Sequence, residues 1–570
     1  MTRRPLLLVL IWAAALMLPF LGQRSWWFPD EPDVALPIIE MHERGDWVVP
    51  THNGRPWLDY QPLVYWGALA VAKVTGSVTE WGSRLPDALA ALLMVVLACV
   101  LVRRRRVDDD ERTLAMGAVL LSMPLVLWQA VNVHPDMPYA AAVTAGLALY
   151  AWAEDMAGST AWAVRAGAFA CLGLAWLGKG PLGLLLPGLV LTLWHAWSRQ
   201  WWRILALGPL TLAALLVVLV WYAPLCHRLG FDYVWGEFQA QNFDRFASGT
   251  NRGHGGKPGW YYLSRLWSEA GLWAALVIPA LVGGWRRRRQ DSRWRLAALW
   301  FVAYFLFLTV AATKRGVYLL PALPALALLV VDWLTSLDEA APWERWWWQI
   351  LAWTLAVVLA VAGTTLVMAG LSWERVVTLP FIARPLAEAD AAAAVMTMAN
   401  GVVLMGAVLA LGAGVAVRWL RLRAPALPVA LVLSLSLGLA WMAGQALILP
   451  RVDTVRTYRP ACAWLAERLT PGAELGFFDP GRENLKRAGF LTYLRGHPLR
   501  YLADETAVRA FLAADPKAIV VVAERRERTL PVEGRIAMWT ISDQGWHVLG
   551  GADQQVAKPA SGFAEQPAAR

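Results

Sequence analysis

Charged residues are scarce in this chain. They make up 16% of its 570 residues, against about 25% in a typical soluble protein. Hydrophobic residues reach 58%, and the mean hydropathy is +0.43. This composition excludes an ordinary soluble protein. The many apolar runs of about 20 residues indicate membrane helices instead.

Cysteine is rare as well, and no periodic repeat is evident. The four cysteines, Cys99, Cys171, Cys226 and Cys462, are widely scattered, and none has metal-ligand spacing or an obvious partner. This distribution argues against a disulfide framework and against a cysteine-based metal site. The N-terminal stretch MTRRPLLLVLIWAAALMLPFLG resembles a signal peptide but lacks an A-x-A-like cleavage site. We therefore expect it to remain as a signal-anchor.

The apolar runs predict about thirteen membrane spans. We expect the spans at about residues 5–22, 84–102, 113–131, 137–153, 163–178, 181–197, 204–224, 267–284, 295–312, 317–334, 347–371, 396–417 and 425–449. Arginine clusters such as Arg103–Arg106 and Arg286–Arg289 fall almost entirely on one predicted side, which sets the N-terminus in the cytoplasm. The net charge of +10 lies largely in these short loops, which favours topology and lipid contact over nucleic-acid binding.

The loop after the first span, from Phe28 to Trp66, is unusually rich in acidic and imidazole groups. Asp30 and Glu31 follow the span immediately, and segments 32–43 and 60–74 have the pattern of amphipathic helices that lie in the membrane interface. Charged groups near lipid are costly unless they face water or a functional site. A solvated loop is the ordinary alternative, but these two features favour a site.

By parity of the spans, several other polar groups meet on the same outer face. They are Asp59, the sequence His134-Pro135-Asp136, Lys179, the loop 225–265 and Lys314-Arg315. Carboxylates beside cations at a membrane surface suit a lipid-linked phosphate, because Lys and Arg neutralise phosphate oxygens and a carboxylate can orient or deprotonate a hydroxyl. Plainer roles remain open, since Lys179 can snorkel, His134 can cap a helix or face water, and Asp136 can cap the fourth span.

The composition changes after about residue 452. AELGFFD, LRYL and AIVVVAE have the pattern of short strands, with helical patterns at 458–469 and 504–514. We therefore predict a membrane domain over residues 1–450 and a small extracytoplasmic α/β domain over residues 451–570, ending in a flexible tail. The second domain carries no recognisable catalytic motif, so we expect it to support or cover the site.

Five segments together resemble a known family. They are GDWVVPTHNGRPWLDYQPLVYW (45–66), SRLPDALAALL (83–93), LAWLGKGPLGLLLPGLVL (174–191), FDRFASGTNRGHGGKPGWYYL (243–263) and KRGVYLLPALPALALL (314–329). In this order they are similar to the aminoarabinose transferase branch of the protein O-mannosyltransferase-like, GT-C superfamily. The resemblance implies a mainly helical polytopic membrane protein. It also implies transfer of a sugar from a polyprenyl-phosphate carrier to an envelope lipid, of which lipid A is the favoured type. The expected location is the bacterial inner membrane, with the site on the periplasmic side.

The resemblance also implies roles for single residues. Asp30, Glu31 and Asp136 match the family's catalytic acidic positions. Asp59 and His254 match a pair that can hold a divalent metal, which here would be zinc, magnesium or manganese. We assign to substrate binding the residues Tyr60, Lys179, Arg252, Lys314, Arg315 and Tyr318.

Two family cations are missing. Asp33 stands where the family has an arginine, and Tyr60 stands where it has a lysine. Arg55, Arg252, Lys257, Lys314 or Arg315 can compensate. The alternatives are a transporter or flippase of lipid-linked sugars and an inactive relative that only binds the carrier. A transporter would carry charges at mid-bilayer, whereas the predicted spans are almost entirely apolar there.

Overall fold

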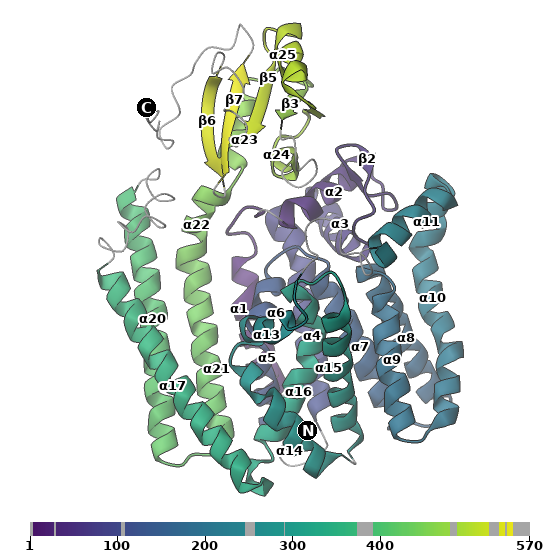
Figure 1. Cartoon of the computed structure of the whole chain (residues 1–570), viewed down its shortest axis with the longest axis vertical. Helices are drawn as coiled ribbons and strands as arrows, with labels where there is room; N and C mark the ends of the chain where they lie inside the picture. The colour runs from purple at the N-terminus through teal and green to yellow at the C-terminus, as the bar shows by residue number, and fades with distance from the viewer. Residues whose placement is uncertain are drawn as a thin grey trace.

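Long helices form the body of the molecule, and a small sheet lies beyond one end of them (Figure 1). The computed structural model describes residues 4–27, 30–103, 109–244, 257–289, 291–372, 391–478, 487–523, 535–541 and 544–550. Within these ranges, every apolar run predicted to span the membrane is helical.

Nine helical segments of the described ranges are long and apolar enough to cross a bilayer, and up to ten if a bent pair counts as one span. These segments contain α4 (Glu80–Val102), α8 (Gly158–Lys179), α10 (Trp201–Leu229), α13 (Tyr261–Ala270) with α14 (Val277–Arg288), α15 (Ser292–Val310), η5 (Gly316–Ala322) with α16 (Leu323–Leu334), α17 (Pro342–Leu371), α20 (Ala391–Arg421), and α21 (Ala426–Ala443) with α22 (Leu449–Arg456). The bent pair is α5 (Asp109–Leu120) and α6 (Pro124–Ala130), whose axes differ by 74°.

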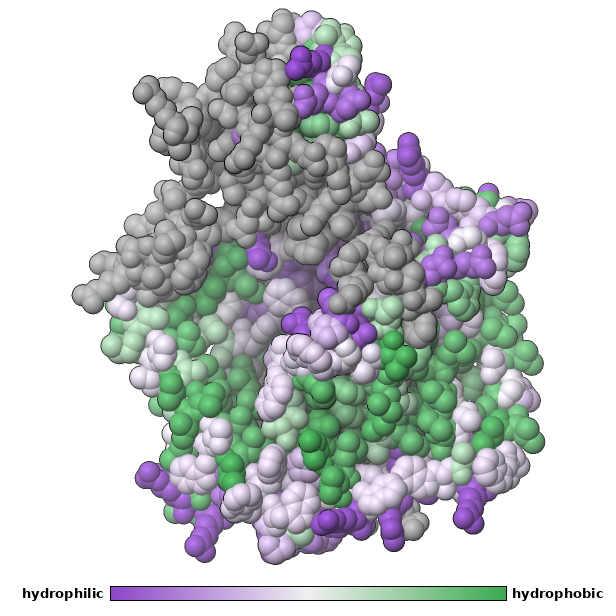
Figure 2. Space-filling view, in the orientation of Figure 1, coloured by the Kyte–Doolittle hydropathy of each residue, from purple (hydrophilic) through white to green (hydrophobic). Residues whose placement is uncertain are grey.

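Three further predicted spans fold as α1 (Arg4–Met17), α7 (Asp136–Ala153) and α9 (Leu182–Trp197), which do not meet the same limits of length and apolar character. The polytopic helical fold is therefore confirmed, whereas the number of thirteen crossings stays a prediction. On the face drawn in Figure 2, hydrophobic residues form a band over the helices, with hydrophilic residues beyond both of its edges. Leu205 and Val310 are each 79% exposed, as expected for side chains that face lipid.

The first loop contains α2 (Asp30–Arg44), the two-stranded hairpin β1 (Thr51–His52) and β2 (Arg55–Pro56), and α3 (Leu63–Thr75). Both predicted amphipathic segments are thus helices. However, α2 does not lie freely in the interface, because every residue from Glu31 to Ile39 is buried. It packs between α3 and α24 (Arg487–Tyr493), and its Leu36 belongs to the hydrophobic core of the C-terminal sheet.

The C-terminal segment forms a five-stranded mixed sheet in the order β4-β3-β5-β7-β6. Its elements are α23 (Arg459–Ala466), β3 (Leu475–Phe478), α24, β4 (Leu499–Tyr501), α25 (Glu505–Ala514), β5 (Ile519–Ala523), β6 (Arg535–Ile541) and β7 (Gln544–Gly550). The three predicted strands and two predicted helices are present, and the antiparallel pair β6–β7 is additional. Pairing with β3 on one side leaves β4 at the edge of the sheet.

Polar contacts fasten this C-terminal part to the start of the first loop. The Asp453 carboxylate on α22 accepts hydrogen bonds from the Ser25 backbone N–H (3.0 Å) and from the Trp27 indole N–H (2.5 Å). The Tyr493 hydroxyl accepts from the Trp26 backbone N–H (2.8 Å) and donates to Glu80 (2.8 Å). The last span and the sheet therefore hold the segment from which α2 begins.

Candidate active-site cavity

A cavity of about 310 Å³ lies where the first loop meets the ends of α7, α8, α9, α15 and η5. Six predicted site residues line it, namely Asp59, Tyr60, Asp136, Lys179, Arg315 and Tyr318. Leu182, Leu185, Leu186, Phe307 and Leu308 supply an apolar wall. The lining of the cavity therefore combines charged groups with apolar side chains.

Asp136 is the centre of the charged groups. Its carboxylate is 1% exposed and forms an ion pair with the ammonium of Lys179, and His134 Nδ1 lies 2.6 Å from its Oδ2. The Lys179 ammonium also lies 4.2 Å from the centre of the Tyr318 ring, a cation–π distance. A buried carboxylate with these partners is a fixed negative charge that holds a cation at the cavity wall.

Local sequence explains this placement. Asp136 is the first residue of α7 and Lys179 the last of α8, so each charge lies at the helix end that stabilises it. Gly180 then turns the chain with φ of +76°, and a Cβ there would lie 2.4 Å from Asn242 Oδ1. Glycine is thus required at this turn for both backbone conformation and space.

Arg315 supplies the second cation of the cavity. Its Nη2 lies 2.9 and 2.8 Å from the two carboxylate oxygens of Asp30, which is the first residue of α2. Asp30 itself does not line the cavity, and it reaches the site through this pair. The Asp30 carboxylate is 37% exposed, so the pair is open to exchange with an incoming anion.

Asp59 and Tyr60 come from the loop before α3. Asp59 is 5% exposed and lines the cavity, and the Tyr60 ring lies edge-on to His134 with centroids 6.2 Å apart. Burial raises the pKa of Tyr60 well above its ordinary value, and the carboxylates of Asp59 and Asp30 add to this effect. Tyr60 is therefore a neutral hydrogen-bonding group at physiological pH.

Glu31 lies behind the cavity rather than in it. Its Oε1 accepts from Arg84 Nε (2.7 Å) and from the Val133 backbone N–H (3.1 Å). Its Oε2 accepts from Arg24 Nη1 (2.6 Å), Arg84 Nη2 (2.9 Å) and the Trp27 backbone N–H (2.9 Å). Burial would raise the pKa of this carboxyl, but the two guanidinium groups outweigh burial and lower it to about 2.

This network joins four segments, namely the end of the first span, α2, α4 and the turn before α7. The resemblance assigns Glu31 to catalysis, whereas its hydrogen bonds give it the geometry of a residue that holds these segments in position. Sequence reasoning did not select Arg24 or Arg84. In the structure Arg84 is fully buried near the start of α4. The available signal in the sequence was a charged residue within the segment 83–93, at the start of a predicted span.

Other predicted residues are not brought to the cavity wall. Lys314 is 5% exposed, and its ammonium donates to the Ala311 carbonyl, while the Lys257 ammonium donates to the Lys314 carbonyl at 2.9 Å. Asp33, at the position of a missing family cation, faces His52 across 3.8 Å. Arg252 and His254 lie outside the described residues.

The metal stays a prediction. Within the ranges that the structure describes, no three His, Cys, Asp or Glu side chains come together in a way that would hold a metal ion. Asp59 is in place, but its predicted partner His254 is outside those ranges.

Apolar helices, a buried charged cluster at their ends and a small sheet beyond them define a mainly helical polytopic membrane protein. Residues 5–234 match the family model described as dolichyl-phosphate-mannose-protein mannosyltransferase. The fold is similar to that of the crystal structure of ArnT from Cupriavidus metallidurans bound to undecaprenyl phosphate. The TM-score is 0.74 at 22% identity, over 98% of this chain and 100% of that chain.

Two curated relatives extend the comparison. Undecaprenyl phosphate-alpha-4-amino-4-deoxy-L-arabinose arabinosyl transferase of Pseudomonas aeruginosa (strain UCBPP-PA14) is 32% identical over 54% of this chain and 56% of the relative. A second enzyme of that name, from Pseudomonas fluorescens (strain Pf0-1), is 30% identical over 57% of this chain and 58% of the relative. The alignments thus span less than two thirds of these relatives. The predicted resemblance is confirmed in fold and in sequence similarity, because the chain has the fold of the ArnT structure and is 30% and 32% identical to these two arabinosyl transferases over just over half of its length.

Replacing Glu31 by Gln should destabilise the protein by about 3–5 kcal/mol, because Arg24 and Arg84 then stay buried without their counter-charge. The stabilisation by Glu31 is complete above pH 4.5 and is lost as the pH falls towards about 2. Melting temperatures of the purified protein between pH 7 and pH 3 should therefore fall less steeply for Glu31→Gln. Glu43→Gln, an exposed site on the same helix, is the control. Equal stability of Glu31→Gln and wild type at pH 7 would contradict the positioning role.

Proposed function

We propose that this protein is a membrane glycosyltransferase that moves a sugar from a polyprenyl-phosphate donor to an envelope lipid, with a lipid A-type glycolipid as acceptor. The observation that carries the proposal is a cavity whose lining combines two cations, Lys179 and Arg315, with an apolar wall. A polyprenyl phosphate has the matching chemistry, an anionic head on a long hydrocarbon tail. The relatives from Pseudomonas are named as undecaprenyl phosphate arabinosyl transferases, which supports the same donor class.

In this account the donor phosphate binds Lys179 and Arg315, and the prenyl tail lies along the leucines of α9. The acceptor oxygen attacks the anomeric carbon of the sugar, and the bond from that carbon to the phosphate oxygen breaks. The leaving group is the polyprenyl phosphate, whose growing negative charge the two cations stabilise. A divalent metal held by the predicted pair Asp59 and His254 would supply a further positive charge to stabilise the leaving phosphate.

We assign to Asp30 a role toward the acceptor. Phosphate binding at Arg315 would compete with the Asp30–Arg315 pair, which frees a carboxylate beside the donor. A free carboxylate can orient an acceptor hydroxyl or take its proton. An acceptor that is itself a phosphate is already anionic and needs only orientation.

A transporter fits the geometry less well, because it would hold its charges near mid-bilayer. Here Asp136, Lys179 and Arg315 lie at helix ends, at the first residue of α7, the last of α8 and the residue before η5. Two cations line this cavity despite the family cations missing at Asp33 and Tyr60, and they would serve an inactive carrier binder as well as an enzyme. The transfer assay below separates these two functions.

In this proposal the cavity and the C-terminal sheet lie on the periplasmic side of the bacterial inner membrane, and the positive-inside pattern supports that orientation. The ends of α14 and α20, which carry arginine clusters, lie at the end of the molecule opposite to the sheet (Figure 1). This polarity supports the proposed orientation, in which donor and acceptor both enter from the outer leaflet.

Replacing Lys179 by Gln should lower kcat by about 100- to 1,000-fold, the cost of removing one well-placed group that stabilises transition-state charge. The assay follows sugar transfer from a polyprenyl-phosphate-linked sugar to lipid A in proteoliposomes, by mass spectrometry. Lys73→Gln, an exposed lysine on α3, should keep full activity and is the matched control. Unchanged kcat in a folded Lys179→Gln variant would remove Lys179 from the mechanism. Absence of transfer by the wild type from donors carrying pentoses and hexoses would refute the proposed function.

Replacing Asp30 by Asn should abolish transfer to a hydroxyl acceptor but merely slow transfer to a phosphate acceptor. The physical reason is that only the hydroxyl needs a base. Rates with glycolipid acceptors carrying or lacking their phosphate groups separate the two cases. Asp155→Asn, a half-exposed residue just beyond the far end of α7, serves as control. Full activity of Asp30→Asn on both acceptors would show that Asp30 plays no part in the chemistry.

A further inference from the structure

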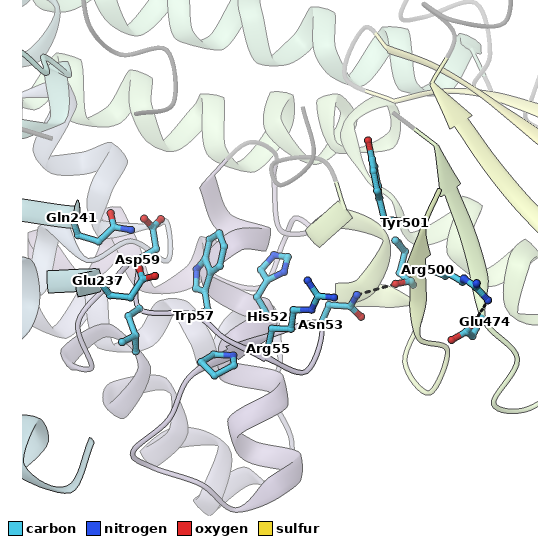
Figure 3. A pocket seen from close by; sticks show the side chains of 13 residues that line it. His52, Asn53, Arg55, Trp57, Asp59, Glu237, Gln241, Glu474, Arg500 and Tyr501 are labelled. Carbon is cyan, nitrogen blue, oxygen red and sulfur yellow. Dashed lines mark hydrogen bonds and ion pairs between the residues drawn. The ribbon is translucent and has the colours of Figure 1, made fainter. Parts of the chain in front are cut away.

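A second and larger cavity, of about 820 Å³, lies between the first-loop hairpin and the edge strand of the C-terminal sheet (Figure 3). Its walls come from β1–β2 and the residues that follow, from β4, and from α11 (Phe231–Gln239) with the short helix η2 (Ala240–Asp244) after it. It is lined by His52, Asn53, Arg55, Pro56, Trp57, Leu58, Asp59, Glu237, Gln241, Glu474, Leu499, Arg500 and Tyr501. Pockets for ligands typically measure about 300–1,000 Å³, so this one has room for more than one sugar ring.

The two cavities adjoin at the proposed reaction site. Asp59 and Gln241 line both of them. The two cavities are therefore neighbours, with the side chains of Asp59 and Gln241 at their common border. This is the geometry needed by the second substrate of a transfer reaction.

The lining chemistry suits a phosphorylated sugar. Arg55 from the hairpin and Arg500 from β4 supply guanidinium groups for an anion, and both are exposed to solvent. Glu237 and Glu474 supply acceptors for sugar hydroxyls. The Trp57 ring gives an apolar face on which a sugar ring can lie, and it lies against His52 with centroids 4.8 Å apart and ring planes tilted by 35°.

A structural contact keeps the two walls together. The Asn53 side-chain amide donates to the Leu499 carbonyl at 2.9 Å, which joins the tip of the hairpin to the edge strand β4. Arg500 in turn lies 3.5 Å from Glu474, an exposed pair that is open to exchange with a ligand phosphate. The C-terminal sheet is thereby placed to contribute an arginine to the cavity.

The border of this cavity favours a lipid-linked ligand. The helix α11, which contributes Glu237, also carries Phe231, Tyr233 and Trp235, which are 65%, 44% and 44% exposed. Exposed aromatic residues on a short amphipathic helix are typical of the membrane interface. A glycolipid could therefore keep its acyl chains in the bilayer beside α11 while its head group enters the polar cavity.

We propose that this cavity binds the phosphorylated sugar head group of the acceptor glycolipid, and that the C-terminal sheet helps to select the acceptor through Arg500. The inference rests on the proposed function, since it names the acceptor site of that reaction. The donor binds in the smaller cavity and the acceptor head group in the larger one, and the two meet at Asp59 and Gln241.

The test uses the full-length protein in nanodiscs and the double variant Arg55→Ser/Arg500→Ser. The binding probe is the deacylated, bisphosphorylated glucosamine disaccharide of lipid A, measured by calorimetry. Removal of two charged hydrogen-bond donors should weaken its binding at least tenfold and raise the KM for lipid A by a similar factor, with the donor KM unchanged. The same disaccharide without phosphates should bind the wild type at least tenfold more weakly. Arg509→Ser, an exposed arginine on α25 that does not line the cavity, is the matched control.

Two further readouts separate this inference from the proposed function. Undecaprenyl phosphate binding should be equal in wild type and double variant, because neither arginine lines the donor cavity. Equal binding of the phosphorylated disaccharide to wild type and double variant would overturn the acceptor site while leaving the donor site standing. Failure of the wild type to bind undecaprenyl phosphate would instead overturn the proposed function.

Discussion

The site depends on one buried carboxylate, that of Glu31, held by two arginines. Arg24 and Arg84 meet it at 2.6 to 2.9 Å, and the Trp27 and Val133 backbone N–H groups complete its shell. Because these partners come from the end of the first span, from α4 and from the turn before α7, the carboxylate fixes the start of α2 against the helix bundle. Asp30, the residue directly before Glu31, is thereby aimed at Arg315. A buried charge network of this kind is costly to break by one member, which makes it a rigid reference point for the site.

Around that reference point, charge and hydrocarbon are kept apart. The carboxylates of Asp30 and Asp136 each hold one cation, Arg315 and Lys179, in a cavity whose apolar wall is made of leucine and phenylalanine. An incoming phosphate can replace the exposed Asp30 carboxylate at Arg315, and it can contact Lys179 while the buried Asp136 carboxylate stays in place. The larger cavity beyond Asp59 is polar and is bounded by the C-terminal sheet. The account thus assigns the carrier lipid and the acceptor head group to different chemical environments.

Much of this could be predicted from the sequence, since apolar runs, arginine clusters and helix-end charges are local signals. The residues of the smaller cavity, such as Asp136 and Lys179, were selected because they fall at span ends on one side. The burial of α2 could not be predicted, because its apolar face packs partly on the C-terminal sheet more than 400 positions later in the chain. The same holds for Glu31, whose partner Arg84 is 53 residues away, and for Arg500, which reaches the hairpin only through the position of β4. Pairings across such separations leave no periodic pattern in a single sequence.

The most direct test of the central claim is an experimental structure of the protein with undecaprenyl phosphate. The account predicts the phosphate within hydrogen-bonding distance of Lys179 and Arg315, with the prenyl chain along Leu182, Leu185 and Leu186 and with Asp30 separated from Arg315. A phosphate bound away from both cations, or a prenyl chain on a different face of the bundle, would contradict it.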